Sequence, residues 1–445
     1  MTSLVPTLSK EREVSIRKSF GKYVSQNIFA MIGISCYVLV DTFFIAQVQG
    51  SDGITILNLC LPIYNFIAAI GSMIGVGSAI EFAVGKAARR KDKDMFFTNA
   101  VYFALIFGFT VMALGLLVPK QILYIMGADK RMATLGAVYI RTFMFFGPTS
   151  VLNQTVNAFV RNDGEPGLAM FSTIVGSLFN IVFDYIFMYP MHLGMFGAAL
   201  ATAFSPVVEI LICLKHFKRA DNEIKLIRML PSFKKIIGAC KVGVSSFIGE
   251  FASGITTTIF NYMILSIAGN IGVASYGVIA NLAIVFVAIF NGVSNGNQPL
   301  ISKSYGQGKK EEYSYLLKLG IKFALFIAVI SYIIVIVLSD QIVFMFNSNG
   351  SKELYDYAKV GLFIYFIGFI FSGLNCVIAG FFSATKNPIP ALIISLSRGV
   401  LLIGVCAVLL GTLFGMNGVW ASYPVAEGIT FLISASFLIN HYRHN

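Results

Sequence analysis

Long runs of apolar residues recur along the whole chain and are separated by short polar segments. A run of about 20 apolar residues, coiled as a helix, is long enough to cross the hydrocarbon core of a bilayer. A membrane β-barrel would instead show short segments of alternating hydrophobicity. The pattern therefore predicts an all-α polytopic membrane protein with twelve transmembrane helices, at about residues 23–47, 54–81, 95–118, 132–159, 166–189, 194–216, 236–267, 273–302, 315–338, 354–382, 389–411 and 416–440.

The overall composition agrees with a membrane protein. Of the 445 residues 57% are hydrophobic and only 12% are charged, whereas a soluble domain has about 25% charged residues. The six cysteines are scattered and form no CxxC pair, so we expect neither a disulfide nor a structural metal site. The first 20 residues are polar and charged, and we therefore expect no cleavable signal peptide.

The positive charge is concentrated in a few links between the apolar runs. The net charge is +12, and Lys and Arg gather at residues 10–22, 86–93, 215–241 and 303–322. Four intervening links, 47–53, 190–194, 268–272 and 411–416, carry no Lys or Arg. This asymmetry follows the positive-inside rule and predicts that both termini are cytoplasmic. Basic loops at anionic lipid headgroups explain the charge, so we expect no nucleic-acid partner.

The two halves of the chain repeat each other. Residues 75–94 align with 296–315, and 194–201 with 415–422, both at a shift of 221. Residues 157–163 align with 379–385 at a shift of 222. Each half has an even number of spans, which predicts a parallel 6+6 repeat about an axis along the membrane normal. The predicted domains are a cytoplasmic segment (1–22), a six-helix lobe (23–216), a cytoplasmic linker (217–235), a second six-helix lobe (236–440) and a short tail (441–445).

Several motifs follow one another in the order of a known transporter family. They are the glycine-rich end of span 2, its echo QPLISKSYGQG at 298–308, the turn RNDGEP at 161–166, and NIVFDY at 180–185 followed by GMFGAALAT at 194–202. Over about residues 15–440 the chain resembles the multidrug and toxic compound extrusion (MATE) family. The resemblance implies a two-lobed antiporter that expels organic cations in exchange for protons or sodium ions.

Two aspartates stand out within the apolar runs of the first half. Asp41 lies toward the outer end of span 1, and Asp184 lies toward the outer end of span 5, which crosses the membrane in the opposite direction. Both are therefore expected at a similar depth, where two carboxylates cannot both stay ionised cheaply. Such a pair suits a proton carrier, and with Asn180 and a hydroxyl it equally suits an oxygen cage for Na⁺. The alternative is a neutral, hydrogen-bonded packing cluster.

The family resemblance implies a fuller cation site around this pair. Members with a cation site in the N-terminal lobe use two Asp, one Asn, one Thr and a backbone carbonyl. The matching positions are Asp41, Asn180, Asp184, Thr202 and the carbonyl of Ala198. Asn157 is a further but lesser candidate because it lies near the cytoplasmic end of span 4. We expect no cofactor beyond the coupling ion, H⁺ or Na⁺, and no metal other than Na⁺ at these residues.

The second half carries three further ionisable candidates for the substrate cavity. Glu250 matches a carboxylate common in the family, but sodium-coupled members pair it with an aspartate where this chain has Ser372. Arg398 and Glu427 lie near mid-depth in adjacent spans and are expected to form a structural salt bridge. An unpaired Glu250 would attract a cationic substrate. The other ionisable residues within spans are Arg141 and, nearer the cytoplasmic ends, Glu81 and Glu209.

These observations predict a secondary active multidrug exporter that works by alternating access in the cell membrane. We expect its substrates to be small, amphiphilic organic cations, and we expect the protein to be a monomer. A flippase for lipid-linked precursors is an alternative from the same superfamily. It would need a cationic cavity, whereas the ionisable residues within the spans are richer in acids. A membrane-embedded enzyme is the least favoured reading, since neither DDxxD nor HExxH occurs, and no Walker A sequence is present.

Overall fold

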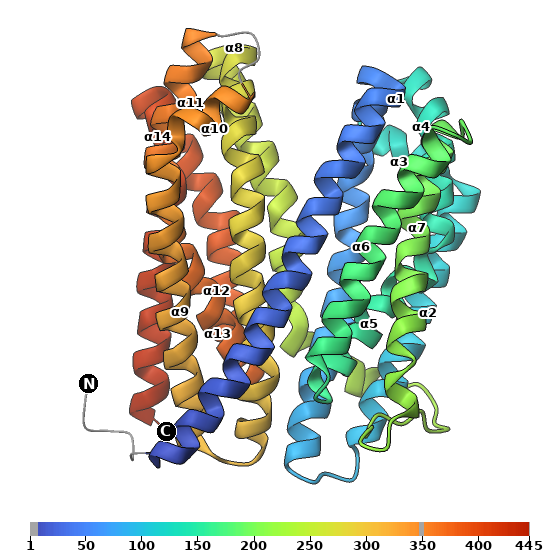
Figure 1. Ribbon diagram of the computed structural model, residues 1–445, viewed down its shortest axis with the longest axis vertical. Coiled ribbons are helices and arrows are strands. Elements are labelled where there is room, and N and C mark those ends of the chain that lie inside the picture. Colours follow the sequence, from blue (N-terminus) through green and yellow to red (C-terminus); the bar gives the residue numbers. More distant parts are fainter. Residues whose placement is uncertain (1–7, 347–350, 445) are drawn as a thin grey trace. The chain divides into compact units, whose positions relative to one another are not determined.

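The computed structural model describes residues 8–346 and 351–444, and within these ranges every regular element is a helix. Residues 1–7 and 445, which belong to the predicted terminal segments, lie outside the described part. The helices are α1 (Lys10–Ala87), α2 (Lys93–Leu117), α3 (Pro119–Ile125), α4 (Lys130–Phe145), α5 (Gly147–Asn162), α6 (Pro166–Met188), α7 (Gly194–Cys213), η1 (His216–Lys218), α8 (Phe233–Gly306), α9 (Lys310–Val337), α10 (Ser339–Phe346), α11 (Lys352–Tyr365), α12 (Gly368–Ala384), α13 (Pro388–Leu396), η2 (Ser397–Leu401) and α14 (Leu402–His444) (Figure 1).

The described helices provide the twelve predicted spans. Nine are long and apolar enough to cross a membrane, and two bent pairs, α4 with α5 and α11 with α12, each supply one more. One of the nine, Pro388–Arg443, has 56 residues and is broken at Gly415, so it contains two spans. The all-α, twelve-span fold class predicted from the apolar runs is confirmed, and the chain is a multi-pass membrane protein.

The repeat between the halves is visible in the backbone. Gly50 and Gly269 break α1 and α8 with φ of 59° and 61°. Gly194 at the start of α7 and Gly415 within α14 have φ of 54° and 60°. A positive φ is accessible to glycine at little cost, so these residues allow consecutive spans to reverse direction within one or two residues. The same joints therefore occur twice, 219 and 221 residues apart, which is close to the shift of the sequence repeat.

The span bends repeat as well. The helix pair α4 and α5 bends by 46° before Gly147, and the pair α11 and α12 bends by 44° before Gly368. These two glycines are 221 residues apart, which is the shift found in the sequence. The two halves thus share their joints and bends, as the predicted 6+6 repeat requires.

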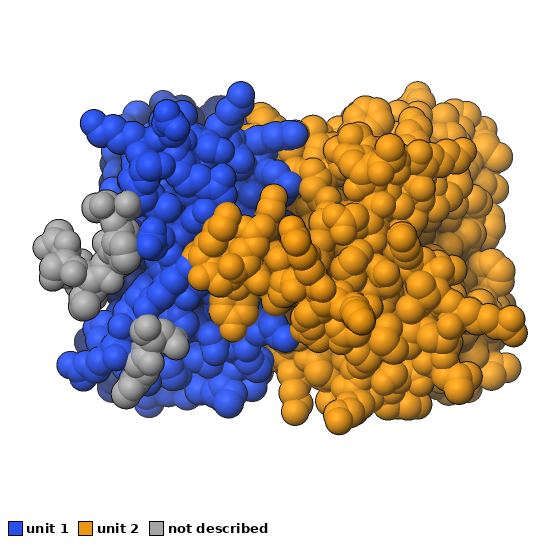
Figure 2. All heavy atoms as spheres, turned by 90° about the horizontal axis from the view of Figure 1, so that it is seen from below, with its two compact units in different colours: residues 1–24, 252–301, 310–445 blue, residues 25–251, 302–309 orange. Residues whose placement is uncertain are grey.

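Two compact units can be distinguished (Figure 2). Unit 1 comprises residues 1–24, 252–301 and 310–445, and unit 2 comprises residues 25–251 and 302–309. These divisions fall inside α1 and α8 and are not those of the predicted domains, whose boundaries stay a prediction. Asp41 and Asp184 belong to unit 2, and Arg398 and Glu427 belong to unit 1.

The glycine-rich motif at the end of span 2 serves close helix packing. A Cβ atom on Gly75 would lie 2.8 Å from the backbone oxygen of Gln154, and one on Gly77 would meet the backbone of Ala239. Contacts this short are possible only for glycine, so α1 lies directly against α5 and against the beginning of α8 within unit 2. The glycines of this motif therefore allow helices to cross in close contact.

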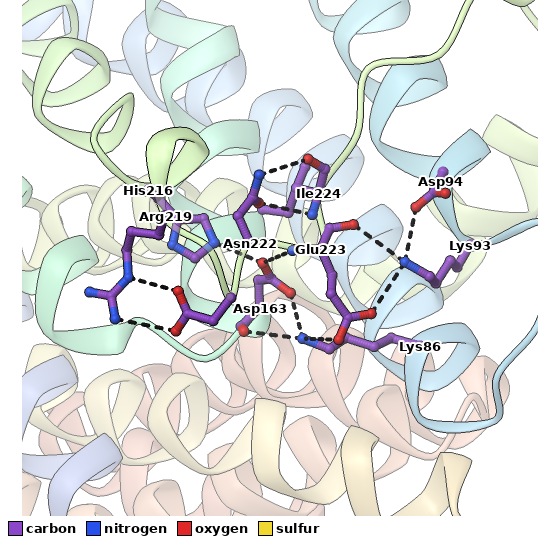
Figure 3. Close-up of polar contacts among 10 residues, drawn as sticks. Lys86, Lys93, Asp94, Asp163, His216, Arg219, Asn222, Glu223 and Ile224 are labelled. Atoms are coloured by element: carbon purple, nitrogen blue, oxygen red, sulfur yellow. Dashed lines mark hydrogen bonds and ion pairs between the residues drawn. The ribbon is translucent and has the colours of Figure 1, made fainter.

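A buried aspartate anchors the linker that follows α7 (Figure 3). The carboxylate of Asp163 accepts hydrogen bonds from Lys86 Nζ at 2.6 Å and from the backbone N–H of Glu223 at 2.9 Å, and it contacts His216 Nε2 at 2.7 Å. The side chain of Asp163 is fully buried. These contacts join the ends of α1, α5 and η1 to the linker. The linker is further held by Asn99, which exchanges two hydrogen bonds with the backbone of Ser232.

The Asp163→Asn variant is expected to unfold more easily, and more so at neutral than at acidic pH. Burial alone would raise the pKa of Asp163, but the contacts with His216 and Lys86 outweigh it and hold that pKa below its usual value. A lowered carboxyl pKa stabilises the fold above the unfolded-state pKa, and this stabilisation is lost as the pH falls through the folded-state pKa. Removing one partner of a buried ion pair costs about 3 kcal/mol. Thermal unfolding of the purified protein at neutral pH and below pH 4 measures both effects. An equal loss of thermal stability at both pH values would contradict this explanation.

Candidate functional site

The predicted cation site lies on α6, α7 and the first half of α1, within unit 2. The helices α6 and α7 run side by side in opposite directions after a short turn (Figure 1). Asn180 and Asp184 are four residues apart on α6, so they share one face of the helix. Both are fully buried, and Asp41 on α1 is 7% exposed. The i, i+4 spacing thus turns these polar side chains away from lipid and toward the neighbouring helices.

Asp41 and Asp184 form a pair. Their carboxyl groups are close enough to hydrogen-bond with each other. Two carboxyl groups can form that bond only if a proton lies between them, so this geometry suits a pair that shares one proton. The second oxygen of each carboxyl, Oδ1, is buried without a hydrogen-bond partner among the described residues. The structure thus places the two carboxyls close together, and their part in cation coupling stays a prediction.

Asn180 connects the pair to α7. With the amide oriented so that both its ends are satisfied, Nδ2 donates to Asp184 Oδ2 at 3.1 Å, and Oδ1 lies 3.3 Å from Thr202 Oγ1. This orientation is assigned from the hydrogen bonds. Ala198, one turn before Thr202, is fully buried. The structure therefore brings together Asp41, Asn180, Asp184 and Thr202, with Ala198 beside them on the same helix.

A small cavity borders Asp41. Its volume is about 40 Å³, enough for one water molecule or a small cation. The wall includes three tyrosines besides apolar side chains, and two of these tyrosines, Tyr37 and Tyr64, hydrogen-bond with each other at 3.0 Å. The residues lining the cavity are Tyr37, Val38, Asp41, Thr42, Leu57, Cys60, Leu61, Tyr64, Tyr139, Phe143 and Thr202.

A larger hollow of about 950 Å³ lies elsewhere in unit 2, and its lining contains none of the paired carboxyls. It is bordered by Asp52 and Arg131, which pair with each other. Among its described lining residues Asp52 is the only acid and is paired, while Lys130 adds positive charge, so the smaller cavity beside Asp41 has the better chemistry for binding a cation.

Asn157 lies in a different polar cluster. Its Nδ2 donates to Thr173 Oγ1 at 3.1 Å, and it makes longer contacts with Ser172 and the backbone of Ala169. Thr173 donates its hydroxyl to the backbone oxygen of Ala169 at 3.1 Å and lies near Glu209. Asn157 thus belongs to the polar cluster on the Glu209 side, and no contact with the aspartate pair is found among the described residues.

Arg398 and Glu427 form the salt bridge expected from their depths. The distance from Arg398 Nη2 to Glu427 Oε1 is 3.0 Å, and the guanidinium also donates to Ser372 Oγ at 2.6 Å. Arg398 lies in the π-helical turn η2, which departs from the regular α-helical hydrogen-bond pattern. Asn375 donates to the other oxygen of Glu427 at 2.7 Å. The pair is therefore fully hydrogen-bonded, and its predicted part in a substrate cavity stays a prediction.

Glu250 is exposed on α8 and has no hydrogen bond or ion pair within the described part of the chain. Three aromatic rings lie around its helix face. Phe66 contacts Phe247 and Phe251 edge-on, with ring centroids 6.3 and 6.1 Å apart, and the latter two rings stack on each other at 5.7 Å. Phe247 and Phe251 are one turn apart and flank Glu250. An uncompensated carboxylate beside exposed rings can bind an organic cation.

Several groups were not predicted from the sequence. Glu209 was noted only for its depth, and Asn153 was overlooked, although Asn153 and Asn157 show the same i, i+4 spacing as Asn180 and Asp184. The tyrosines around Asp41 carry no spacing in the sequence that distinguishes them from other aromatic residues of the spans. Asn375 and Ser434, which hydrogen-bond with each other beside Glu427, gave no periodic signal.

The fold and these sites define a multi-pass helical protein with a carboxyl pair buried in its spans, as in ion-coupled transporters. The MatE family profile matches residues 27–186 and 246–408, which is most of the chain. The protein belongs to the MatE family, the multidrug and toxic compound extrusion family that the sequence motifs resemble.

Relatives and solved structures agree with this assignment. The chain is 27% identical over 399 residues to the multidrug export protein MepA of Staphylococcus saprophyticus, covering 89% of this chain and 87% of the relative. It is 25% identical over 403 residues to MepA of Staphylococcus aureus, with the same coverage. A structure described as the outward-facing conformation of a multidrug resistance MATE family transporter has a TM-score of 0.89, 21% identity, and 97% coverage of both chains. This structural likeness supports the fold.

Proposed function

We propose that the protein is a secondary active multidrug exporter that expels organic cations in exchange for protons. The family assignment and the similarity to proteins named multidrug export protein support this proposal. The observation that carries it is the hydrogen-bonded pair of Asp41 and Asp184, buried within the spans. A pair of carboxyl groups at this depth can take up and release a proton, but it cannot hold two negative charges cheaply.

The carboxyl pair favours a proton over Na⁺ as the coupling ion, because two carboxyl groups within hydrogen-bonding reach of each other can share a proton. Asn180 can serve either ion. Its N–H can donate to Asp184, and the opposite orientation of the amide brings its oxygen to the carboxyl, where it could be a ligand for Na⁺. We place the protein in the cell membrane with both termini in the cytoplasm, as the distribution of Lys and Arg suggests.

Alternating access follows from a difference in ion affinity between two states. Protonation neutralises the pair and changes how α1 packs against α6 and α7. An ion shifts a conformational equilibrium only by as much as it prefers one state, and a tenfold preference corresponds to about 1.4 kcal/mol. Proteoliposomes containing the purified protein test the proposal. An imposed pH gradient should drive uptake of the fluorescent cation ethidium, whereas uptake driven only by a sodium gradient would contradict proton coupling.

Substrate binding is expected to depend on Glu250. Changing Glu250 to Gln should weaken ethidium binding about tenfold, because the cation loses its one nearby carboxylate but keeps the stacked rings. The neighbouring Phe66→Ala variant should weaken binding of ethidium and of a neutral aromatic compound alike. Fluorescence titration of the detergent-solubilised protein measures both. Glu353→Gln, which removes an exposed carboxylate from α11, is the matched control. Unchanged ethidium affinity in Glu250→Gln would exclude Glu250 from the substrate site.

A further inference from the structure

A second carboxyl site lies in unit 2, two helical turns along α7 from Thr202. Glu209 is seven residues after Thr202, so both side chains project from the same face of the helix. Its Oε2 accepts a hydrogen bond from Asn153 Nδ2 at 3.0 Å, and Thr173, which donates its hydroxyl to the backbone oxygen of Ala169, lies near it. No lysine or arginine pairs with Glu209 among the described residues. This carboxylate within a span therefore lacks a compensating positive charge.

The neighbouring helices leave space for the side chain of Glu209 and provide a hydrogen-bond partner for it. A Cβ atom at position 176 would lie 2.5 Å from Glu209 Cγ and 2.7 Å from its Oε1. Gly176 therefore leaves the space on α6 that the carboxyl occupies. Asn153 is 8% exposed, and its Oδ1 is buried and accepts no hydrogen bond in the described part of the chain. One end of this amide is thus satisfied by Glu209, while the other end is a buried acceptor without a donor.

Asn153 can serve both protonation states of the carboxyl. When Glu209 is ionised, Asn153 Nδ2 donates to it, as observed. When Glu209 is protonated, half a turn of the amide lets Asn153 Oδ1 accept the new O–H. The buried acceptor thereby gains a partner upon protonation. A purely structural carboxylate would need no such second acceptor.

The remaining titratable groups around Glu209 carry no positive charge. Tyr37 and Tyr64 on α1 and Cys213 on α7 interact with it electrostatically. The facing residues of α5 and α6 are the neutral Asn153, Asn157 and Thr173. A proton is accordingly the simplest species that can neutralise Glu209.

Hydroxyl groups lie between this site and the aspartate pair. Ser205, on α7 between Thr202 and Glu209, donates to the backbone oxygen of Gly176 at 2.8 Å. On α6, Ser177 lies between Thr173 and Asn180 and donates to the backbone of Thr173 at 2.8 Å. Two adjacent helices therefore carry continuous polar faces from Asp184 to Glu209.

We propose that Glu209, with Asn153 and Thr173, is a second proton-binding site of unit 2, which exchanges protons with the pair of Asp41 and Asp184 during transport. This inference rests on the proposed proton coupling. The carboxylate of Glu209 takes up one proton from the aspartate pair and becomes a neutral carboxyl, and it then releases that proton toward the cytoplasm and is ionised again. The site would lie on the cytoplasmic side of the pair, on the route by which protons leave.

Infrared difference spectroscopy tests the site directly. Spectra are recorded between high and low pH on protein whose glutamate side chains carry ¹³C, which separates glutamate from aspartate carboxyl bands. A labelled band of a protonated carboxyl that persists above the pH at which exposed glutamates ionise should be present in the wild type and lost in Glu209→Gln. It should remain in the Asp41→Asn/Asp184→Asn double variant, so failure of the aspartate pair to couple is distinguishable from failure of this proposal. Glu165→Gln, at a cytoplasmic ion pair with Arg219, should keep the band.

Transport supplies the second readout. The Glu209→Gln variant can keep its contacts with Asn153 and Thr173, so it should unfold at the wild-type temperature and bind ethidium normally. Its uptake under a pH gradient should fall about tenfold. If that variant does not fold, Asn153→Ser replaces it, and the glutamate band should then persist to higher pH because ionised Glu209 loses its amide donor. A band retained in Glu209→Gln, or transport at the wild-type rate, would overturn the proposal.

Discussion

Replacing Asp184 with asparagine is expected to abolish gradient-driven efflux and to leave the protein folded. Asparagine has nearly the same shape and can keep a hydrogen bond to Asn180, but it cannot bind or release a proton. Only the carboxyl of Asp41 would remain to titrate, and without a second carboxyl to share its proton the site would lose the paired group through which the gradient shifts the conformational equilibrium. Ethidium uptake into proteoliposomes under an imposed pH gradient should fall to the level of protein-free liposomes.

Variants of Asp41 and Asn180 provide further controls with effects of different size. Asp41→Asn should have the same effect as Asp184→Asn, because each removes one of the two carboxyls. Asn180→Ala should reduce transport less under a proton gradient than under a sodium gradient, since its oxygen matters chiefly as a ligand for a metal ion. Wild-type export by both aspartate variants would make the pair structural, and Glu250 would become the coupling candidate.

Removing one member of the Arg398–Glu427 pair is expected to destabilise unit 1 strongly. Arg398→Met leaves the carboxylate of Glu427, which is 2% exposed, without its cation. Breaking a buried pair in this way costs about 3–5 kcal/mol. Glu427→Gln should cost less than Arg398→Met, because the guanidinium keeps its hydrogen bond to Ser372. Unfolding of the purified protein by denaturant measures the free energy of each variant.

The double variant separates pairing from packing. Arg398→Met combined with Glu427→Gln leaves no buried charge, so it should recover a large part of the stability lost in Arg398→Met alone. A double-mutant cycle then gives the interaction energy of the pair. Strictly additive losses would show that the two side chains act independently, contrary to the observed contact.

Much of the fold could be predicted because the bilayer imposes simple rules on a sequence. A buried backbone must satisfy its own hydrogen bonds, so apolar runs of sufficient length become helices. The parallel repeat followed from matched motifs and from the even number of spans in each half. The bends before Gly147 and Gly368 were not predicted, since a glycine within an apolar run does not reveal by itself whether a helix bends there.

Part of the candidate site could also be predicted from the sequence. Asp41 and Asp184 could be placed together because both are costly in lipid and their spans cross the membrane in opposite directions. Arg398 and Glu427 could be paired for the same reason of charge and depth. The Glu209 site was missed because it depends on which faces of α5, α6 and α7 meet. Asn153 and Gly176 contact Glu209 only because these helices pack together, and periodicity along one helix does not predict that packing.

The four left-handed glycines, Gly50, Gly194, Gly269 and Gly415, bear on how such a chain arose. A segment of six spans begins and ends on the same side of the membrane, so a tandem copy of its gene would insert in the same orientation as the original. Fusion of two copies would need no inversion and no additional helix. After duplication each copy could change its side chains while the joints kept the shared backbone. In the present chain the first half carries the paired carboxyls of Asp41 and Asp184, and the second half carries the pair of Arg398 and Glu427 at 3.0 Å.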